Sequence, residues 1–144
     1  MGTCLLVAAT LLLGAGAPTD AAVAEGLKPF QGTWTPESME MDGKFLSPER
    51  LAKVRLTIDG ANFTFETAED SHAGLYKIDP SKDPKELDIE ITRGDEKGKV
   101  YLVIYQFADG KMIQSMRVDN KERAREFTGK AGSGNLYEIW KRVK

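Results

Sequence analysis

Alternation of apolar and polar residues is the dominant pattern of this chain. Val54, Leu56 and Ile58 alternate with polar neighbours, and Leu87, Ile89 and Ile91 repeat the pattern further along. Successive side chains of a β-strand point to opposite faces, so a period of two indicates strands with one buried face. Similar apolar segments predict further strands at 31–41, 62–67, 74–79, 100–107, 111–118 and 135–143.

Short turn signals separate these segments. Asp42-Gly43, Asp59-Gly60 and Asp109-Gly110 are Asp-Gly pairs, which are typical of tight hairpin turns. Ser47-Pro48 predicts one short helix, because Ser caps a helix and Pro suits its first position. The segment Val100–Phe107 is apolar on both faces, so we expect it to be covered on both sides.

The spacing of strands and turns indicates an all-β fold. About eight short strands with hairpin connections and one short helix are typical of a small antiparallel up-and-down barrel. Closure of the sheet also removes the exposed strand edges that invite aggregation. A β-sandwich has the same alternation and remains the alternative fold.

The first residues resemble an export signal. Leu5–Leu13 is apolar but too short to span a bilayer core of about 30 Å as a helix, and Ala22-Val23-Ala24 fits an A-x-A cleavage site. We therefore predict a signal peptide at 1–24 and a barrel domain at 25–144, in a protein exported to the periplasm or the exterior. No stable membrane span is expected after leader removal; cleavage after Ala17 and a retained anchor are the alternatives.

Charge and cysteine content exclude several classes of function. The 144 residues carry 20 basic and 22 acidic groups, and removal of Asp20 with the leader leaves a net charge of −1. This balance does not predict nucleic-acid binding, which requires a basic surface. The single cysteine, Cys4, lies in the predicted leader, so no disulfide is expected in the mature chain.

The search for catalytic chemistry is negative. His72 is the single histidine, and its polar surroundings predict an exposed turn. Asp88 and Glu90 share one strand face, but their apolar neighbours point the other way, which predicts the wet side of a barrel wall. We expect a protein that is not an enzyme, with no catalytic, cofactor-binding or metal-binding residues.

Several segments together resemble a known family. Gln31-Gly-Thr-Trp34, Gly74–Asp79, Pro84–Ile89, Arg123–Phe127 and the closing Lys141-Arg-Val are similar to an uncharacterised lipocalin-like (calycin-type) domain family, common in exported planctomycete proteins. The resemblance covers 27–144 and implies a small barrel, without an established activity or ligand. By analogy with lipocalins, Gly32 and Trp34 would mark the closed end, with Arg142 over the Trp34 ring as a cation–π contact.

The most apolar strand supplies the candidate binding face. If that face points inward, its aromatic rings and hydroxyls suit an amphipathic ligand, although an eight-stranded barrel can also be filled by its own side chains. The candidate lining residues are Phe63, Phe65, Tyr76, Tyr101, Val103, Tyr105 and Phe107, and the candidate mouth charges for an anionic head group are Arg117, Arg123 and Arg125.

Two hypotheses of function follow. The first is a non-enzymatic barrel that binds a small apolar or amphipathic molecule. The alternative is a structural or protein-interaction module of the cell envelope with a filled core, no ligand and an unknown protein partner. An interior cavity of about 300 Å³ or more would favour the first.

Overall fold

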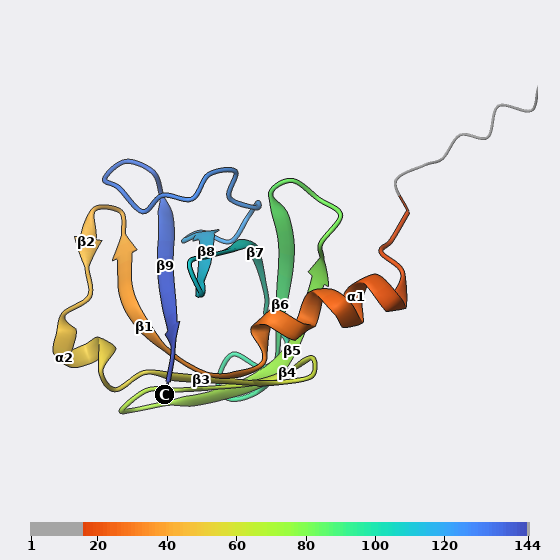
Figure 1. Ribbon diagram of the computed structural model, residues 1–144. Helices are drawn as coiled ribbons and strands as arrows, with labels where there is room; N and C mark the ends of the chain where they lie inside the picture. The colour runs from red at the N-terminus through yellow and green to blue at the C-terminus, as the bar shows by residue number, and fades with distance from the viewer. Residues whose placement is uncertain (1–15, 144) are drawn as a thin grey trace, which may run out of the picture.

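The computed structural model describes residues 16–143 as a closed antiparallel barrel of eight strands with one extra strand, which confirms the predicted all-β barrel (Figure 1). Neighbouring strands in the chain are neighbours in the sheet, and β1 pairs with β9 to close it. The short strand β2 adds to the end of β1. The strands are β1 Gly32–Met41, β2 Lys44–Phe45, β3 Arg55–Asp59, β4 Asn62–Glu66, β5 Ser71–Asp79, β6 Lys85–Arg93, β7 Val100–Ala108, β8 Lys111–Arg117 and β9 Asn135–Arg142.

Within residues 16–143, two α-helices and one 3₁₀ turn accompany the strands. Helix α2 (Pro48–Leu51) begins as predicted, with the Ser47 side chain accepting a hydrogen bond from the Arg50 amide and Pro48 at the first position. Helix α1 (Asp20–Leu27) lies outside the barrel against β5 and continues into the 3₁₀ turn η1 (Lys28–Phe30) (Figure 1).

The predicted signal peptide falls partly outside the described residues, at 1–15. Its predicted cleavage site, after Ala24, lies inside α1, and Val23 and Leu27 on either side pack against the core. Cleavage there would remove the first part of this helix. Among residues 16–143, none of the helices has the length and apolar character needed to cross a membrane.

The closure of the barrel depends on an irregularity in β1. This strand pairs with β3 only from Gly32 to Trp34, whereas its pairing with β9 continues to Met41. Between the two regions the register with β9 shifts at Pro36 to Ser38. Proline has no amide hydrogen to donate, so it is tolerated where one neighbouring strand departs.

Two of the Asp-Gly pairs form the tight turns that they predict. Asp42 and Gly43 have φ angles of 50° and 85°, and Asp109 and Gly110 have φ angles of 53° and 74°. Positive φ at both central residues matches the right-handed twist of the flanking strands. At the third pair only Gly60 has a positive φ, because Asp59 still belongs to β3.

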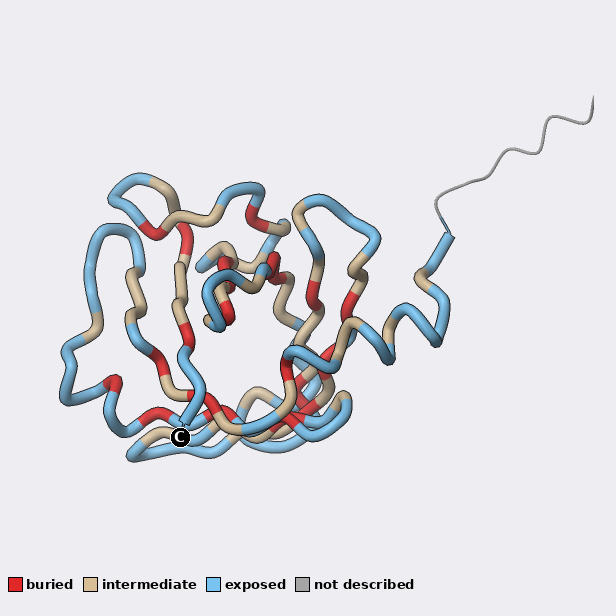
Figure 2. Tube along the Cα trace, in the orientation of Figure 1, coloured by how far each residue is buried: buried red, intermediate tan, exposed pale blue. Residues whose placement is uncertain are grey.

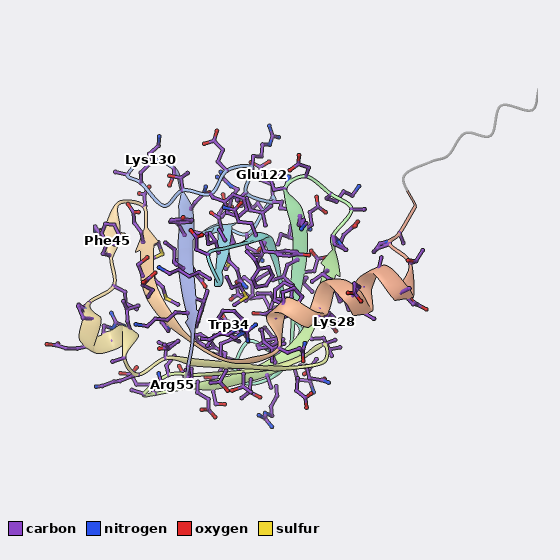
Figure 3. The ribbon with its side chains drawn as sticks, in the orientation of Figure 1. Lys28, Trp34, Phe45, Arg55, Glu122 and Lys130 are labelled. Atoms are coloured by element: carbon purple, nitrogen blue, oxygen red, sulfur yellow. The ribbon has the colours of Figure 1, made fainter. Side chains whose placement is uncertain are left out.

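Aromatic rings fill the closed end of the barrel, where Trp34 is labelled in Figure 3. Figure 2 marks the buried positions along the strands in red. Trp34 is fully buried, and its indole donates a 2.7 Å hydrogen bond to the Phe30 carbonyl. The Arg142 guanidinium lies 4.3 Å from the centre of the Trp34 ring and also donates to the carbonyls of Pro29, at 2.7 Å, and Gln31. Gly32 adopts a φ of 112° beside this guanidinium, where a Cβ would lie 3.2 Å from it.

Residues 118–134, which we call the strap, connect β8 to β9 in the chain. The strap packs on the outside of the barrel, where Arg123 contacts β6 and β7. The strap brings buried Ala124 near Ile104 on the outer face of β7. Three successive residues of β7, Val103, Ile104 and Tyr105, are therefore buried. This confirms that the most apolar strand is covered on both sides.

The closed end yields a test of stability. Replacement of Arg142 by Met should lower the free energy of unfolding by about 1–3 kcal/mol, because it removes the cation–π contact and two charge-assisted hydrogen bonds. Lys141→Met, on the exposed neighbouring residue, should change it by less than about 0.5 kcal/mol. Equal urea midpoints for the two variants would contradict the role assigned to Arg142.

Candidate functional site

The interior of the barrel holds a cavity of about 220 Å³ beyond the aromatic closed end. It begins midway along the barrel and reaches the opposite end, where β5, β7 and β9 begin and β6 and β8 finish. Side chains at this outer end, such as Phe65 and Met116, are partly exposed, so the cavity communicates with solvent there. The lining consists of Leu56, Phe63, Phe65, His72, Tyr76, Ile89, Ile91, Glu96, Tyr101, Gln114, Met116, Glu138 and Trp140.

Four of the seven lining residues predicted from the sequence border the cavity: Phe63, Phe65, Tyr76 and Tyr101. The other three belong to the packed core instead. Tyr105 and Phe107 pack their rings against Phe30, each at a centroid distance of 4.9 Å, and Val103 is buried. The prediction identified the inward face of β7 correctly, but a strand nine residues long runs through both the cavity and the closed end.

A layer of polar groups separates the cavity from the closed end. Gln114 and Glu138 are opposite each other on β8 and β9, and both line the cavity. Glu138 accepts a 2.7 Å hydrogen bond from the indole of Trp140. Across the barrel, burial raises the pKa of the Tyr76 hydroxyl, with a hydrogen bond from Gln114 opposing this effect and the nearby Glu138 adding to it.

Glu138 is the most unusual ionisable group of the site. Its carboxyl lies deep in the barrel but keeps some free surface, because it borders the cavity. Burial raises the pKa of this carboxyl from 4.5 to about 7, and the hydrogen bond from Trp140 only partly opposes the shift. A carboxyl that titrates near neutral pH inside an apolar cavity is a candidate functional group.

A second carboxylate, Glu96, lies at the outer end of the cavity. It accepts hydrogen bonds from the Tyr101 hydroxyl at 2.7 Å and from the Lys99 ammonium at 3.0 Å. The Tyr101 contact, followed by the Lys99 contact, holds the pKa of Glu96 below its ordinary value. Glu96 is therefore a neutralised part of the rim, in contrast to Glu138.

His72 is not in the exposed turn that the sequence predicted. It belongs to β5, lines the cavity and stacks on Phe65 at a centroid distance of 6.3 Å. Its Nδ1 is buried and has no hydrogen-bond partner among the described residues, and a Cβ on Gly94 would lie 2.6 Å from that atom. The prediction was wrong because β5 begins at Ser71, three residues earlier than expected, which places His72 in register with Gly74 and Tyr76.

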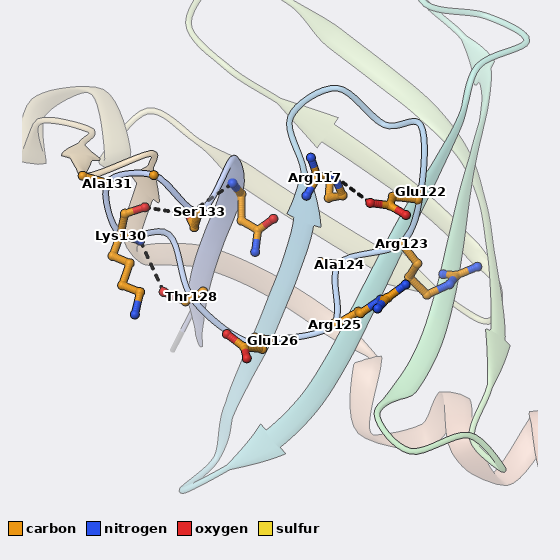
Figure 4. A pocket seen from close by; sticks show the side chains of 12 residues that line it. Arg117, Glu122, Arg123, Ala124, Arg125, Glu126, Thr128, Lys130, Ala131 and Ser133 are labelled. Carbon is orange, nitrogen blue, oxygen red and sulfur yellow. Dashed lines mark hydrogen bonds and ion pairs between the residues drawn. The ribbon is translucent and has the colours of Figure 1, made fainter.

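The three arginines predicted for the mouth lie on the outer wall of the barrel (Figure 4). Arg117 follows inward-facing Met116 on β8, so it faces out, where it pairs with Asp119 at 3.2 Å. Arg123 and Arg125 belong to the strap. None of the three arginines lines the interior cavity; all three border a separate pocket of about 400 Å³ formed mainly by the strap.

Arg123 instead attaches the strap to the wall. It donates hydrogen bonds to the carbonyls of Leu87 and Val103 at 3.1 and 2.8 Å, and to the Asp88 carboxylate at 2.6 Å. Asp88 and Glu90 lie on the outer face as predicted, and Glu90 pairs with Lys77 at 2.6 Å. The paired outer charges have a structural role.

Sequence reasoning missed Glu138 and Gln114, although a signal for both is present. Glu138 alternates with Leu136 and Trp140, and Gln114 alternates with Met112 and Met116. A polar residue in the middle of an apolar strand face predicts a buried polar group, which needs a hydrogen-bond partner or has a functional role.

In the part of the chain that the structure describes, no group of three or more His, Cys, Asp or Glu side chains could hold a metal ion. Comparison of the chain with protein-family models, curated proteins and solved structures found no significant match. The cavity and its polar layer are therefore the basis for an argument about function.

Glu138 should make stability depend on pH. A carboxyl whose pKa is higher in the folded than in the unfolded protein favours folding while protonated, so this contribution is lost as pH rises from about 4.5 to about 7. Glu138→Gln should remove the loss and exceed the wild type in free energy of unfolding by up to about 3 kcal/mol at pH 8, with little difference at pH 4.

Urea unfolding of both proteins from pH 4 to pH 8 measures this difference. Glu66→Gln, which changes an exposed carboxylate on β4, is the matched control and should keep the wild-type profile. A pH-independent difference between wild type and Glu138→Gln would show that Glu138 does not titrate in this way.

The strap offers a separate test. Arg123→Met should lower the free energy of unfolding by about 1–3 kcal/mol, because it removes a charged donor from two backbone carbonyls and Asp88. Arg125→Met, on an exposed neighbour, should lower it by less than about 0.5 kcal/mol. Thermal or urea unfolding checks both, and equal effects would contradict an anchoring role for Arg123.

Proposed function

We propose that this protein is an exported, non-enzymatic, lipocalin-like barrel that binds a small amphipathic molecule in its interior. The observation that carries the proposal is the cavity, apolar along most of its wall and with a few polar groups midway down the barrel. Such a lining is typical of small-molecule sites, in which polar groups orient a ligand held by apolar contacts. The predicted leader supports export.

The cavity volume limits the size of the ligand. At about 220 Å³ it is smaller than the roughly 300 Å³ at which sites for drug-sized ligands begin. It is larger than an apolar cavity of about 150 Å³ that admits benzene. The ligand we propose therefore has about one ring, or a short branched chain, and one polar group.

The alternative, a protein-interaction module, rests on a filled core. The cavity of about 220 Å³ is smaller than the roughly 300 Å³ that would favour ligand binding, but it leaves interior space that a filled core would not. Arg123, one of the candidate mouth charges for an anionic head group, instead holds the strap against the barrel wall. A non-enzymatic role is favoured over proton transfer by Glu138, because among the described residues its side chain has a hydrogen bond only from Trp140.

A pair of variants tests ligand binding. Ile89→Phe adds volume inside the cavity, whereas Ile113→Phe adds the same volume on the outer face of β8. Benzyl alcohol titrated into the wild type should shift NMR signals of cavity residues. Its affinity should fall at least about tenfold in Ile89→Phe and stay unchanged in Ile113→Phe, because filled space excludes the ring.

Native mass spectrometry of protein purified from its own envelope is the complementary measurement. A bound mass that is lost in Ile89→Phe and kept in Ile113→Phe would identify the natural ligand. Equal benzyl alcohol titrations for the two variants would place binding outside the barrel and contradict the proposal.

A further inference from the structure

The polar layer of the cavity has a definite charge preference. Two carboxyl groups, Glu96 and Glu138, border the cavity, and no lysine or arginine of residues 16–143 is among its lining residues. Glu96 is already paired with Lys99 at 3.0 Å. Glu138 has the indole of Trp140 as its neutral partner and no ion pair within the described residues. The Glu138 carboxylate could therefore pair with a cation supplied by a ligand.

The rings around Glu138 suit a cation as well. Trp140 and Phe65 meet edge to face at 6.4 Å, and Phe63 and Tyr76 lie at 5.1 Å from each other. All four line the cavity with Glu138. The face of an aromatic ring attracts an ammonium group, and the attraction is strongest where water is excluded. A carboxylate among aromatic rings is therefore complementary to an organic amine.

Resting on the proposed ligand-binding function, we propose that the cavity selects a small primary amine with a single ring or short apolar chain, whose ammonium group pairs with Glu138. The apolar part of the amine occupies the space between Leu56, Ile89 and Met116 toward the open end. The ammonium donates to the free surface of the Glu138 carboxylate, while the Trp140 indole continues to hold that carboxylate in place.

This arrangement couples binding to pH. The groups that face the cavity and titrate are Glu138 on β9, His72 and Tyr76 on β5, Tyr101 on β7 and Glu96 in the loop between β6 and β7. Glu138 must lose its proton to pair with an ammonium. Since its pKa lies at about 7, amine affinity should rise between pH 6 and pH 8.

Three probes with one ring and different charges test the selection. Calorimetric titrations at pH 8 should find benzylamine about tenfold tighter than benzyl alcohol, with benzoate weakest. Benzylamine should bind about tenfold more weakly at pH 6 than at pH 8, as expected for a carboxyl with a pKa near 7. The affinity for benzyl alcohol should be the same at pH 6 and at pH 8.

Variants assign the effect to a residue. Glu138→Gln should reduce benzylamine affinity to that of benzyl alcohol and abolish the pH dependence of benzylamine binding. His72→Gln should keep most of the pH dependence. Glu96→Gln should keep the preference for the amine, because Glu96 is already paired with Lys99. If Glu138→Gln does not fold, the affinities of the wild type for the three probes at pH 6 and pH 8 still test whether the cavity selects an amine.

The outcomes separate the two proposals. Benzyl alcohol that binds in the cavity without a preference for benzylamine, or a preference that survives Glu138→Gln, would overturn amine selection and leave ligand binding intact. Absence of binding by both probes at millimolar concentration would overturn both.

Discussion

The pairing of β1 with β9 is the contact on which the rest of this structure depends. It joins the first and last strands of the sheet and so converts a row of hairpins into a barrel with an inside. The irregularity at Pro36 lets β1 part from β3 and still follow β9 to its end. Arg142, at the end of β9, then lies over Trp34, at the start of β1. The same two strands, β1 and β9, therefore close both the wall of the barrel and its end.

The interior of a barrel this small is divided between packing and binding. An eight-stranded barrel is only just wide enough for side chains or one small ligand. Here Phe30, Trp34, Tyr105 and Phe107 fill the closed half, and the rings above them leave the cavity open. The boundary is polar because Gln114 and Glu138 replace apolar residues at the middle of their strands. Burial of the Glu138 carboxyl costs free energy, and a core that served only to support the fold would be more stable with an apolar residue there.

Charges are separated between the two faces of the wall. Outside, Lys77 pairs with Glu90, Lys111 with Glu37 and Arg123 with Asp88. The two lysine pairs are in contact with water and each contributes little alone, whereas Arg123 also donates to two backbone carbonyls and so anchors the strap. Inside, Glu138 lies in an apolar space and has no charged partner among residues 16–143. Glutamate therefore forms structural ion pairs on the outer face of the wall, whereas on the inner face Glu138 is available to bind a ligand.

Local pattern determined the strands, the Ser47-capped helix, two hairpin turns and the double burial of β7, because period and turn chemistry are properties of neighbouring residues. The same periodicity named Phe63, Phe65, Tyr76 and Tyr101 as candidates for an inward face, and the structure places all four at the cavity. Only the tertiary structure decided that Arg117, Arg123 and Arg125 lie outside the cavity, that β5 extends back to His72, and that Glu138 lines the cavity with the Trp140 indole as its hydrogen-bond donor. Those features depend on where the strap runs and how strands far apart in the chain pair, since burial and the pKa of a carboxyl are set by everything that surrounds it.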